Sequence, residues 1–502
     1  MRRFAVLWML CGVWCACPGT VSGNDGGSGG GSATGGGSAS GGGAATGGGA
    51  ATGGGSATGG GSATGGGAAT GGGAATGGGA ATGGGAATGG GSATGGGSAS
   101  SCTALPAPTG NVVDVTDVTS LLAAVNNAAA NDTIRLADGT YALNGSYVYI
   151  TKPGVTLRSK SGNREAVIID GNYYVDPGGQ GIGQILVTIA ANDVTVADLT
   201  VSRAYDHPIH VDASGGDVTG AKIYNVHVID PGQQGIKVNG DEPSFTHFAD
   251  NGTIACSRIE LTDTGRPSIR DNCYTGGVDV HAARGWTVRD NQIEGFWCTT
   301  GLSEHGIHFW KGVRDVVVER NQVKDCARGI GFGLGNGTAG RAYSDNPCNG
   351  LQNAGAYDGV IRNNFVSASS AGLFSSPDGF DSGIGLELAC GTTVAHNSVA
   401  STMAPGSSAI EWRWTGGDIT LTNNLATAQL KPRDGANAVS AGNQSGATLS
   451  DFADVAGGDL HLAASAAAPK NAGVAATSAA SDDIDGEARS TTTPDVGADE
   501  VP

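Results

Sequence analysis

Seven short segments between residues 190 and 430 share one alternation of apolar and polar positions. In every copy the third and fifth residues are apolar, while the fourth and sixth are mostly polar, which is the period-two pattern of a half-buried strand. The segments are HPIHVD at 207, QGIKVN at 234, GGVDVH at 276, HGIHFW at 305, RGIGFG at 328, SGIGLE at 382 and SAIEWR at 408. They predict equivalent strands of a repeating fold.

A second type of strand carries an asparagine at one fixed position. WTVRDNQI, VVVERNQV, GVIRNNFV, TTVAHNSV and ITLTNNLA place it at Asn291, Asn321, Asn364, Asn397 and Asn424. An asparagine stacked on an asparagine can hydrogen-bond its neighbours and satisfy the buried backbone of a tight bend. We therefore interpret this series as structural.

The repeat distance is roughly 30 residues, with no helical pattern between the strands, which is typical of a solenoid built from short strands. Successive coils of such a solenoid stack at about 4.8 Å, the separation of strands in a sheet. Longer spacings at 239–252 and roughly 334–357 indicate loop insertions. The fold class is therefore all-β.

Three further features resemble the right-handed parallel β-helix superfamily that includes pectate lyases and many secreted bacterial repeat proteins. Asp117–Asn131, with Leu121, Leu122 and Val125 on one face, resembles the short N-terminal capping helix of that superfamily. NDTIRLADGTY at 131–141 resembles its first strand, and DDIDGEARSTTTPDVGADE at 482–500 is similar to its C-terminal signature. The resemblance implies a β-helix over 102–440 and C-terminal coils with a cap over 441–502. It implies no single activity, because this scaffold carries many chemistries.

The N-terminal hundred residues indicate export and a tether. Residues 1–23 have the basic start and the short apolar stretch of a signal peptide, and that stretch is too short to span a bilayer. Lipidation at Cys17 and cleavage after Gly23 both remain open. Residues 24–101 are a low-complexity Gly/Ala/Ser/Thr linker, which we expect to be disordered. The expected location is extracellular or the cell surface, with a bacterial outer-membrane lipoprotein as one form.

Charge narrows the choice of partner. The chain has 45 acidic and 27 basic residues and a net charge of −18, which argues against nucleic acid as a partner. An acidic protein that handles an acidic polymer needs a local basic patch or bound cations. We expect a monomer.

Seven cysteines follow the linker, and export permits disulfides between them. Proximity favours Cys256–Cys273, Cys298–Cys326 and Cys348–Cys390, but spacing alone leaves the connectivity open. An odd number leaves at least one thiol unpaired or paired between chains.

The outward positions of the seven strands define two columns of side chains. The fourth position gives His210, Lys237, Asp279, His308, Gly331, Gly385 and Glu411, and the sixth gives Asp212, Asn239, His281, Trp310, Gly333, Glu387 and Arg413. The small residue before each inward Ile or Val suggests a shallow floor beside them. A floor of glycine with a charged edge predicts a polymer-binding cleft.

These columns contain the groups that β-elimination of a uronic-acid polymer requires, namely a cation for the substrate carboxylate, a base and an acid. The predicted catalytic residues are His210, Lys237, His281, His308, Lys311 and Arg413. Asn239, Trp310 and Glu411 are predicted to bind substrate, and Asp212, Asp279 and Glu387 to hold calcium. The predicted function is cleavage of an acidic polysaccharide.

Several alternatives stay open. The columns suit a surface ladder of salt bridges, a transition-metal site of His210, His281, His308 and Asp279, or a non-catalytic adhesin or glycan-binding module. A glycoside hydrolase would pair Asp279 with Glu411 or Glu387. His207 and His305 are interpreted as turn residues, and Trp286 and Trp412 as core. The carboxylate sets of polygalacturonases and alginate epimerases are not found, so these roles rest on the columns alone.

Overall fold

The computed structural model describes residues 102–270, 272–348, 351, 353–475 and 480–501. The signal peptide predicted for 1–23 and the linker predicted for 24–101 lie outside these residues. In the described part of the chain, no helix has both the length and the apolar character needed to cross a membrane.

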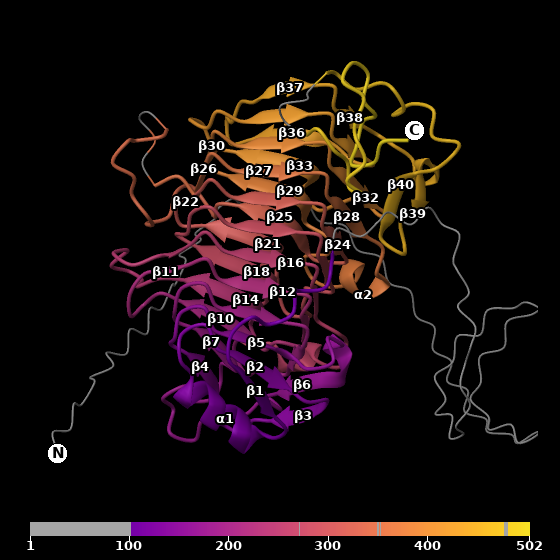
Figure 1. The fold of residues 1–502 in the computed structure, drawn as a ribbon. Coiled ribbons are helices and arrows are strands. Elements are labelled where there is room, and N and C mark those ends of the chain that lie inside the picture. Colours follow the sequence, from indigo (N-terminus) through magenta and orange to yellow (C-terminus); the bar gives the residue numbers. More distant parts are fainter. Residues whose placement is uncertain (1–101, 271, 349–350, 352, 476–479, 502) are drawn as a thin grey trace, which may run out of the picture. The chain divides into compact units, whose positions relative to one another are not determined.

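Strands of the described chain form three long sheets in which every neighbouring pair is parallel, and successive coils contribute one strand to each sheet (Figure 1). The chain has the right-handed parallel β-helix fold that its sequence predicts, and the right-handed crossover is the normal one between parallel strands. The ten-stranded sheet holds the seven repeated segments. Its strands are β4 (Val148–Ile150), β7 (Val187–Ile189), β10 (Ile209–Asp212), β14 (Gln234–Asn239), β18 (Gly276–His281), β21 (His305–Trp310), β25 (Arg328–Phe332), β29 (Ser382–Glu387), β33 (Ser408–Arg413) and β36 (Leu430–Arg433).

The other two long sheets complete each coil. The twelve-stranded sheet contains β1 (Val112–Val115), β2 (Thr133–Leu136), β5 (Thr156–Ser159), β8 (Thr195–Ala197), β12 (Lys222–Tyr224), β16 (Thr253–Ala255), β19 (Thr287–Arg289), β23 (Val317–Glu319), β27 (Val360–Arg362), β31 (Thr393–Ala395), β34 (Thr420–Thr422) and β37 (Val439–Ala441). The eleven-stranded sheet contains β3 (Gly139–Ala142), β6 (Val167–Asp170), β9 (Thr200–Ser202), β13 (His227–Ile229), β17 (Arg258–Glu260), β20 (Gln292–Glu294), β24 (Gln322–Lys324), β28 (Phe365–Ala368), β32 (Ser398–Ser401), β35 (Leu425–Ala426) and β38 (Gln444–Ser445).

Short elements decorate the coils. Two parallel ladders lie at the loop insertions, one of β11 (Val218–Thr219) and β15 (Ala249–Asp250), the other of β22 (Val313–Arg314), β26 (Ala356–Tyr357) and β30 (Ala389–Cys390). An antiparallel pair joins β39 (Phe452–Asp454) to β40 (Asp459–Leu462), and α2 spans Ala371–Phe374. Single 3₁₀ turns occur at Arg164–Ala166, Arg266–Ser268 and Leu449–Asp451.

The inward positions of the ten-stranded sheet form the predicted apolar columns. Ile236, Val278, Ile307 and Ile330, for example, are fully buried. Trp286 and Trp412 are also buried, as interpreted from the sequence. Burial of a side chain of this size contributes about 1.5–3 kcal/mol.

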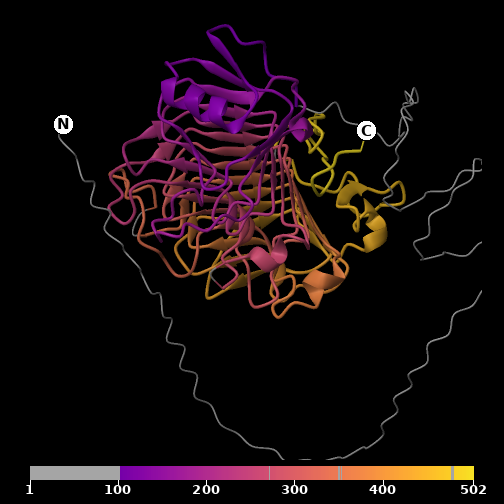
Figure 2. The same ribbon diagram turned by 90° about the horizontal axis from the view of Figure 1, so that it is seen from below.

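The helix predicted for 117–131 is α1 (Val118–Asn127), which lies across the first coil (Figure 2). Asp117 caps it by accepting a hydrogen bond from the Ser120 backbone N–H at 2.7 Å. Leu121 and Val125 bury its apolar face against the coils, which closes that end of the core.

The asparagine series is a buried ladder, as predicted. Each side-chain oxygen accepts hydrogen bonds from the backbone N–H and from the side-chain amide of the asparagine one coil earlier. Each side-chain amide also donates to a backbone carbonyl of the preceding coil. The ladder also continues past Asn424 to Asn443 at one end and to Ser257 at the other. It fixes the bend between the twelve-stranded and eleven-stranded sheets.

The C-terminal segment continues the coils only as far as β38. After it, Phe452, Leu460 and Val496 pack against Phe365 and Leu425 on the outer face of the eleven-stranded sheet. The Ser398 hydroxyl accepts a hydrogen bond from the Ala498 backbone at 2.9 Å. The described residues 452–475 and 480–501 therefore pack on the side of the solenoid.

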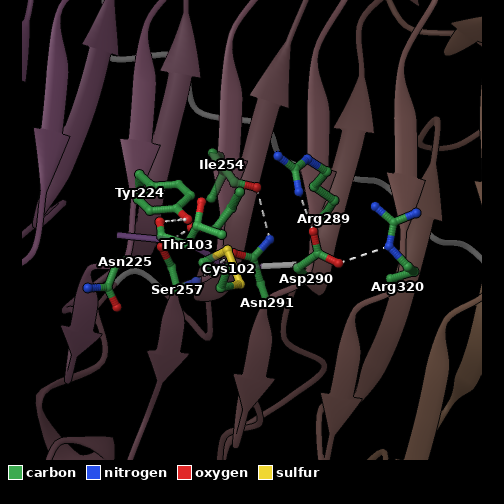
Figure 3. The surroundings of a disulfide bond; sticks show 12 residues. Cys102, Thr103, Tyr224, Asn225, Ile254, Ser257, Arg289, Asp290, Asn291 and Arg320 are labelled. Carbon is green, nitrogen blue, oxygen red and sulfur yellow. Dashed lines mark hydrogen bonds and ion pairs between the residues drawn. A yellow bond between two sulfur atoms is a disulfide. The ribbon is translucent and has the colours of Figure 1, made fainter. Parts of the chain in front are cut away.

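Three disulfides join the described cysteines, and only one agrees with the pairing favoured by proximity. Cys348–Cys390 is confirmed, but the other bonds are Cys102–Cys256 and Cys273–Cys298, and Cys326 is a buried free thiol. The pairings Cys256–Cys273 and Cys298–Cys326 were wrong because the segment before the first strand runs along the twelve-stranded sheet and reaches Cys256 from outside. Tyr224 holds that segment by donating a hydrogen bond from its hydroxyl to the Thr103 carbonyl at 2.5 Å (Figure 3).

Replacing Asn321 with Ala tests the ladder. Asn321 is fully buried, so the change leaves polar groups on both adjacent coils without a hydrogen-bond partner. Each buried unsatisfied group costs about 1–3 kcal/mol. We expect the free energy of unfolding, measured by urea titration, to fall by about 3 kcal/mol or more. Asn443→Ala at the half-buried end of the ladder is the control and should cost less than half as much; equal losses would contradict the ladder.

Cys326 should be inert in the folded protein. Burial first, and then the nearby carboxylates, raise the pKa of its thiol to about 12, so the reactive thiolate is scarce. We expect iodoacetamide to modify Cys326 only after denaturation without reductant, as read by peptide mass spectrometry. Rapid modification in native buffer, or recovery of Cys326 in a disulfide-linked peptide, would contradict the assignment.

Candidate functional site

The ten-stranded sheet stacks the repeated segments in the register expected from their pattern. In the fourth-position column, His210 pairs with Lys237, Lys237 with Asp279, and Asp279 with His308. Gly331, Gly385 and Glu411 continue it. Residues that are far apart along the chain therefore share one face of the sheet.

This face is not the open, solvated edge expected for it. Lys237, Asp279, His281 and His308 are 7%, 1%, 5% and 0% exposed. The loop insertion after β14 contributes to this burial by returning to the sheet and placing Glu242 against His281. Trp310 contributes as well, because it contacts Asp279 and His308. The central charged groups form a buried network.

Lys237 occupies the centre of this network. Its ammonium Nζ lies 2.5 Å from Asp279 Oδ2, 2.7 Å from His281 Nε2 and 3.4 Å from the Tyr274 hydroxyl. An ammonium has three N–H donors, and each of these atoms can accept one of them. Burial would raise the pKa of Asp279, but His281 and Lys237 outweigh it and hold that pKa well below its usual value.

Glu242 orients the imidazole of His281. The Nδ1 atom of His281 lies 2.5 Å from Glu242 Oε1 and donates to it, while Nε2 lies 2.7 Å from the Lys237 ammonium and 3.0 Å from Asp279 Oδ2. In the neutral ring Nε2 carries the lone pair and accepts from Lys237. Lys311 forms an ion pair with the other oxygen of Glu242. Partial burial opposes ionisation of Glu242, but His281 and Lys311 outweigh it and lower its pKa to about 2.

Tyr274 lies at the edge of the network and is partly exposed. Burial, and then the carboxylates of Asp279, Glu304 and Glu242, raise the pKa of its hydroxyl far above its usual value. The hydroxyl therefore keeps its proton and can donate it.

Trp310 joins the Lys237 network to the next coil. Its indole Nε1 donates to Asp279 Oδ1 at 2.8 Å, and its ring stacks on His308 with an interplanar angle of 5°. The Lys311 ammonium lies 4.5 Å from the centre of the indole ring. Trp310 remains partly exposed.

A second group of side chains adjoins His308. His308 Nε2 donates to the Gly333 carbonyl at 2.9 Å, while its Nδ1 lies 3.0 Å from Glu304 Oε2. His305 is the first residue of β21 and lies with its ring centre 4.4 Å from that of His308. The interpretation of His305 as a turn residue was therefore wrong. Burial first, and then Arg328 and His308, lower the pKa of His305 to about 3, so it is neutral.

Other predicted site residues form pairs of their own. His210, which is next to Lys237 across β10 and β14, donates from Nε2 to Asn239 Oδ1 at 2.6 Å. Arg413 pairs with Glu387 and Asp434 on β29–β36, and Glu411 pairs there with Arg433. Each of these hydrogen bonds and ion pairs joins neighbouring coils.

The carboxylates predicted to hold calcium do not converge. Asp212, Asp279 and Glu387 lie on β10, β18 and β29, and five strand spacings of about 4.8 Å separate the first from the last. No single ion can bind all three. The same separation opposes the hydrolase pairs, because Glu411 is four strands and Glu387 three strands from Asp279.

The glycine floor was also wrong. A Cβ added at Gly277 would lie 2.7 Å from the Ile293 side chain, and one at Gly329 would lie 2.7 Å from the Val366 side chain. These glycines face the interior bend, where the core packs too closely for any side chain. A cavity of about 450 Å³ lies instead at the capping helix, lined by Leu122, Val125, Tyr147 and Tyr149 among others.

Sequence reasoning missed Glu242, Tyr274 and Glu304. Glu242 and Tyr274 lie in irregular segments between strands, where no periodic pattern marks them. Glu304 had a signal, because an acidic residue precedes the His–x–Ile–His pattern both here and at Asp206.

Comparison with known proteins assigns no activity. No protein-family model matches the chain, and no curated protein matches its sequence. Among solved structures it is similar to pectate lyase Pel9A, at 16% identity and a TM-score of 0.49, over 76% of this chain and 90% of that one. It is also similar to alginate lyase from Paenibacillus sp. str. FPU-7, at 15% identity and a TM-score of 0.43, over 66% of this chain and 99% of that one. A third similar structure is PfbA, a surface adhesin of Streptococcus pneumoniae, at 11% identity and a TM-score of 0.36, over 65% of this chain and 85% of that one.

The Glu242–His281 contact predicts a specific dependence on pH. The folded pKa of Glu242 lies below its usual value of 4.5, so its stabilising contribution is complete above that value and is lost as the pH falls through about 2. We expect Glu242→Gln to lower the free energy of unfolding by about 3 kcal/mol at pH 6, with the difference shrinking toward pH 2.

Urea titrations at several pH values measure this difference. The matched control is Glu294→Gln, because Glu294 forms a more exposed ion pair with Lys324 on the eleven-stranded sheet. That pair should contribute about 1 kcal/mol or less. A Glu242→Gln deficit that stays constant from pH 6 to pH 2 would contradict the assignment.

Proposed function

We propose that the protein binds an acidic polysaccharide along the ten-stranded sheet and cleaves it by β-elimination. The observation that carries the proposal is the array of Glu242, His281 and Lys237, with the Tyr274 hydroxyl 3.4 Å from the lysine. The array holds a base beside an acid, partly exposed at Tyr274. Export and a surface tether, inferred from the sequence, would bring the site to such a polymer.

Lys237 is the candidate base. As an ammonium it cannot accept a proton, but the His281 Nε2 lone pair lies 2.7 Å away and can take one from it. Glu242 accepts from His281 Nδ1 and stabilises the imidazolium that forms. The neutral amine of Lys237 can then remove the proton on the carbon next to the substrate carboxylate.

Tyr274 is the candidate acid. When the carbon–oxygen bond to the next sugar breaks, its electron pair goes to the leaving oxygen, and the Tyr274 hydroxyl supplies the proton. The electrons of the removed carbon–hydrogen bond form the new carbon–carbon double bond. Lys311, which pairs with Glu242, is the candidate cation for the substrate carboxylate. Calcium at Asp212 or Glu387 would reduce repulsion between an acidic chain and an acidic polymer.

A non-catalytic glycan-binding or adhesin role is the second candidate. The observation that favours it is the burial and complete pairing of Lys237 and Asp279, which is equally consistent with a network that stabilises a binding surface. Such a surface would bind polymer through Trp310 and Lys311 without changing it.

Incubation of the full chain with pectate, alginate and chondroitin, with and without calcium, separates these functions. A lyase produces an unsaturated sugar that absorbs ultraviolet light, whereas a hydrolase produces reducing ends without that absorbance. We expect Tyr274→Phe and Lys237→Met to lower the rate by about a hundredfold or more.

The control is Lys222→Met on β12 of the twelve-stranded sheet, where Lys222 lies 4.8 Å from the centre of the Tyr224 ring. It should leave the rate unchanged, and thermal melting should show that all three variants fold. Polymer binding without product, equally strong in the wild type and Tyr274→Phe, would favour the adhesin role. Full activity in Tyr274→Phe and Lys237→Met would refute the assigned base and acid.

A further inference from the structure

One five-residue pattern occurs twice where the chain enters a strand of the ten-stranded sheet. It consists of an acidic residue, a histidine, a small residue, isoleucine and a second histidine. The first copy is Asp206–His210 and the second is Glu304–His308. In both copies the two histidine rings are neighbours, with centres 5.7 Å and 4.4 Å apart. The two copies therefore present the same side chains in a similar local arrangement.

In the first copy, protein partners occupy the polar groups. Asp206 forms an ion pair with Arg270. His207 Nδ1 donates to the Gln234 carbonyl at 3.2 Å, and His210 Nε2 donates to Asn239 Oδ1 at 2.6 Å. This copy is a satisfied part of the framework.

In the second copy, three polar atoms face one another without hydrogen bonds. Glu304, His305 and His308 each offer a ligand atom, and these atoms lie within 4.8 Å of one another. Glu304 Oε2, His305 Nδ1 and His308 Nδ1 are buried and make no hydrogen bond of acceptable geometry. Although Glu304 Oε2 is only 3.0 Å from His308 Nδ1, the ring nitrogen does not point along that line. Buried polar atoms without partners are costly, so a cluster of three requires an explanation.

The Gly333 carbonyl fixes which nitrogen of His308 is free. Because Nε2 donates to that carbonyl at 2.9 Å, the neutral ring carries its lone pair on Nδ1. That nitrogen lies 3.0 Å from Glu304 Oε2 and 3.7 Å from Asp279 Oδ1. A nitrogen lone pair this close to two carboxylate oxygens is repelled by them unless a proton or a cation lies nearby.

The next coil leaves space for His305. A Cβ at Gly331 would lie 2.4 Å from His305 Nε2, so only glycine at this position of β25 admits the imidazole. The nearest cation is Arg328, at 3.7 Å from Glu304 Oε2, but its guanidinium donates to the Ser303 carbonyl at 2.8 and 3.0 Å. It therefore forms no hydrogen bond with the Glu304 oxygen.

We propose that Glu304, His305 and His308 bind one divalent transition-metal ion, with Zn²⁺ as the best match, through Oε2 and the two Nδ1 atoms. Two imidazoles and one carboxylate suit zinc and its neighbours, whereas calcium and magnesium prefer ligand sets made of oxygen. The hydrogen bond from His308 to a backbone carbonyl is the usual support of a metal-binding histidine. Three protein ligands leave one position for water or a substrate oxygen. The site differs from the predicted set of His210, His281, His308 and Asp279, in which the His281 lone pair faces Lys237.

Metal binding to the full chain tests the proposal without an activity assay. The protein is treated with a chelator, dialysed and titrated with Co²⁺, whose visible spectrum reports tetrahedral nitrogen and oxygen ligands, and zinc content is measured by mass spectrometry. We expect one equivalent of Co²⁺ that Zn²⁺ displaces and that excess Ca²⁺ does not. Thiolate ligation by cysteine would give a distinct charge-transfer band. A Co²⁺ spectrum that contains this band would overturn the assignment.

Variants locate the ion. His305→Ala and the nearly isosteric Glu304→Gln should each weaken Co²⁺ binding at least tenfold, while His207→Ala, the matching change in the first copy, should leave it unchanged. His461→Ala is a second control, because His461 lies with Asp485 and Asp499 in the other described group of adjacent His and Asp side chains. A folded wild type without the tetrahedral spectrum, or binding lost only in His461→Ala, would overturn the proposal.

Discussion

The parallel, in-register stacking of coils is the constraint on which the rest of this structure depends. Each strand of the ten-stranded sheet pairs with the same position of the next repeat, so Lys237 meets Asp279 across 42 residues of chain. A slip of one residue would exchange the inner and outer faces of a strand. The asparagine ladder opposes such a slip, because each amide bonds both the preceding and the following coil. Register set at the bend therefore determines which side chains meet on the opposite sheet.

Burial then changes the chemistry of the groups that stacking brings together. Removing a lysine and an aspartate from water is expensive, and their attraction offsets the cost only when the remaining donors and acceptors are also paired. Tyr274, His281 and Trp310 complete that pairing around Lys237 and Asp279. The loop that carries Glu242 makes this possible by covering a face that the strand pattern alone would leave in water.

The sequence pattern was sufficient for the parts of the fold that repeat. Apolar third and fifth positions predict the core columns, the asparagines predict the ladder, and a shared position predicts that Lys237, Asp279 and His308 lie together. It was insufficient wherever a neighbour comes from an irregular segment. Burial of the column depends on Glu242, and the Cys102–Cys256 bond depends on a segment that runs beside the coils. Alternation also does not reveal whether a glycine beside a bend faces the core or solvent.

The two Asp/Glu–His–x–Ile–His copies show why local pattern alone does not determine function in a solenoid. At 206–210 the adjacent coil offers Asn239, and Arg270 reaches the acidic group. At 304–308 the adjacent coil offers Gly331 and Gly333, which supply space and a carbonyl but no side chain. The same residues are thus satisfied in one coil and left facing one another in the other. The chemistry of each repeat is therefore determined by the residue one coil away, about thirty positions along the chain, as much as by its own sequence.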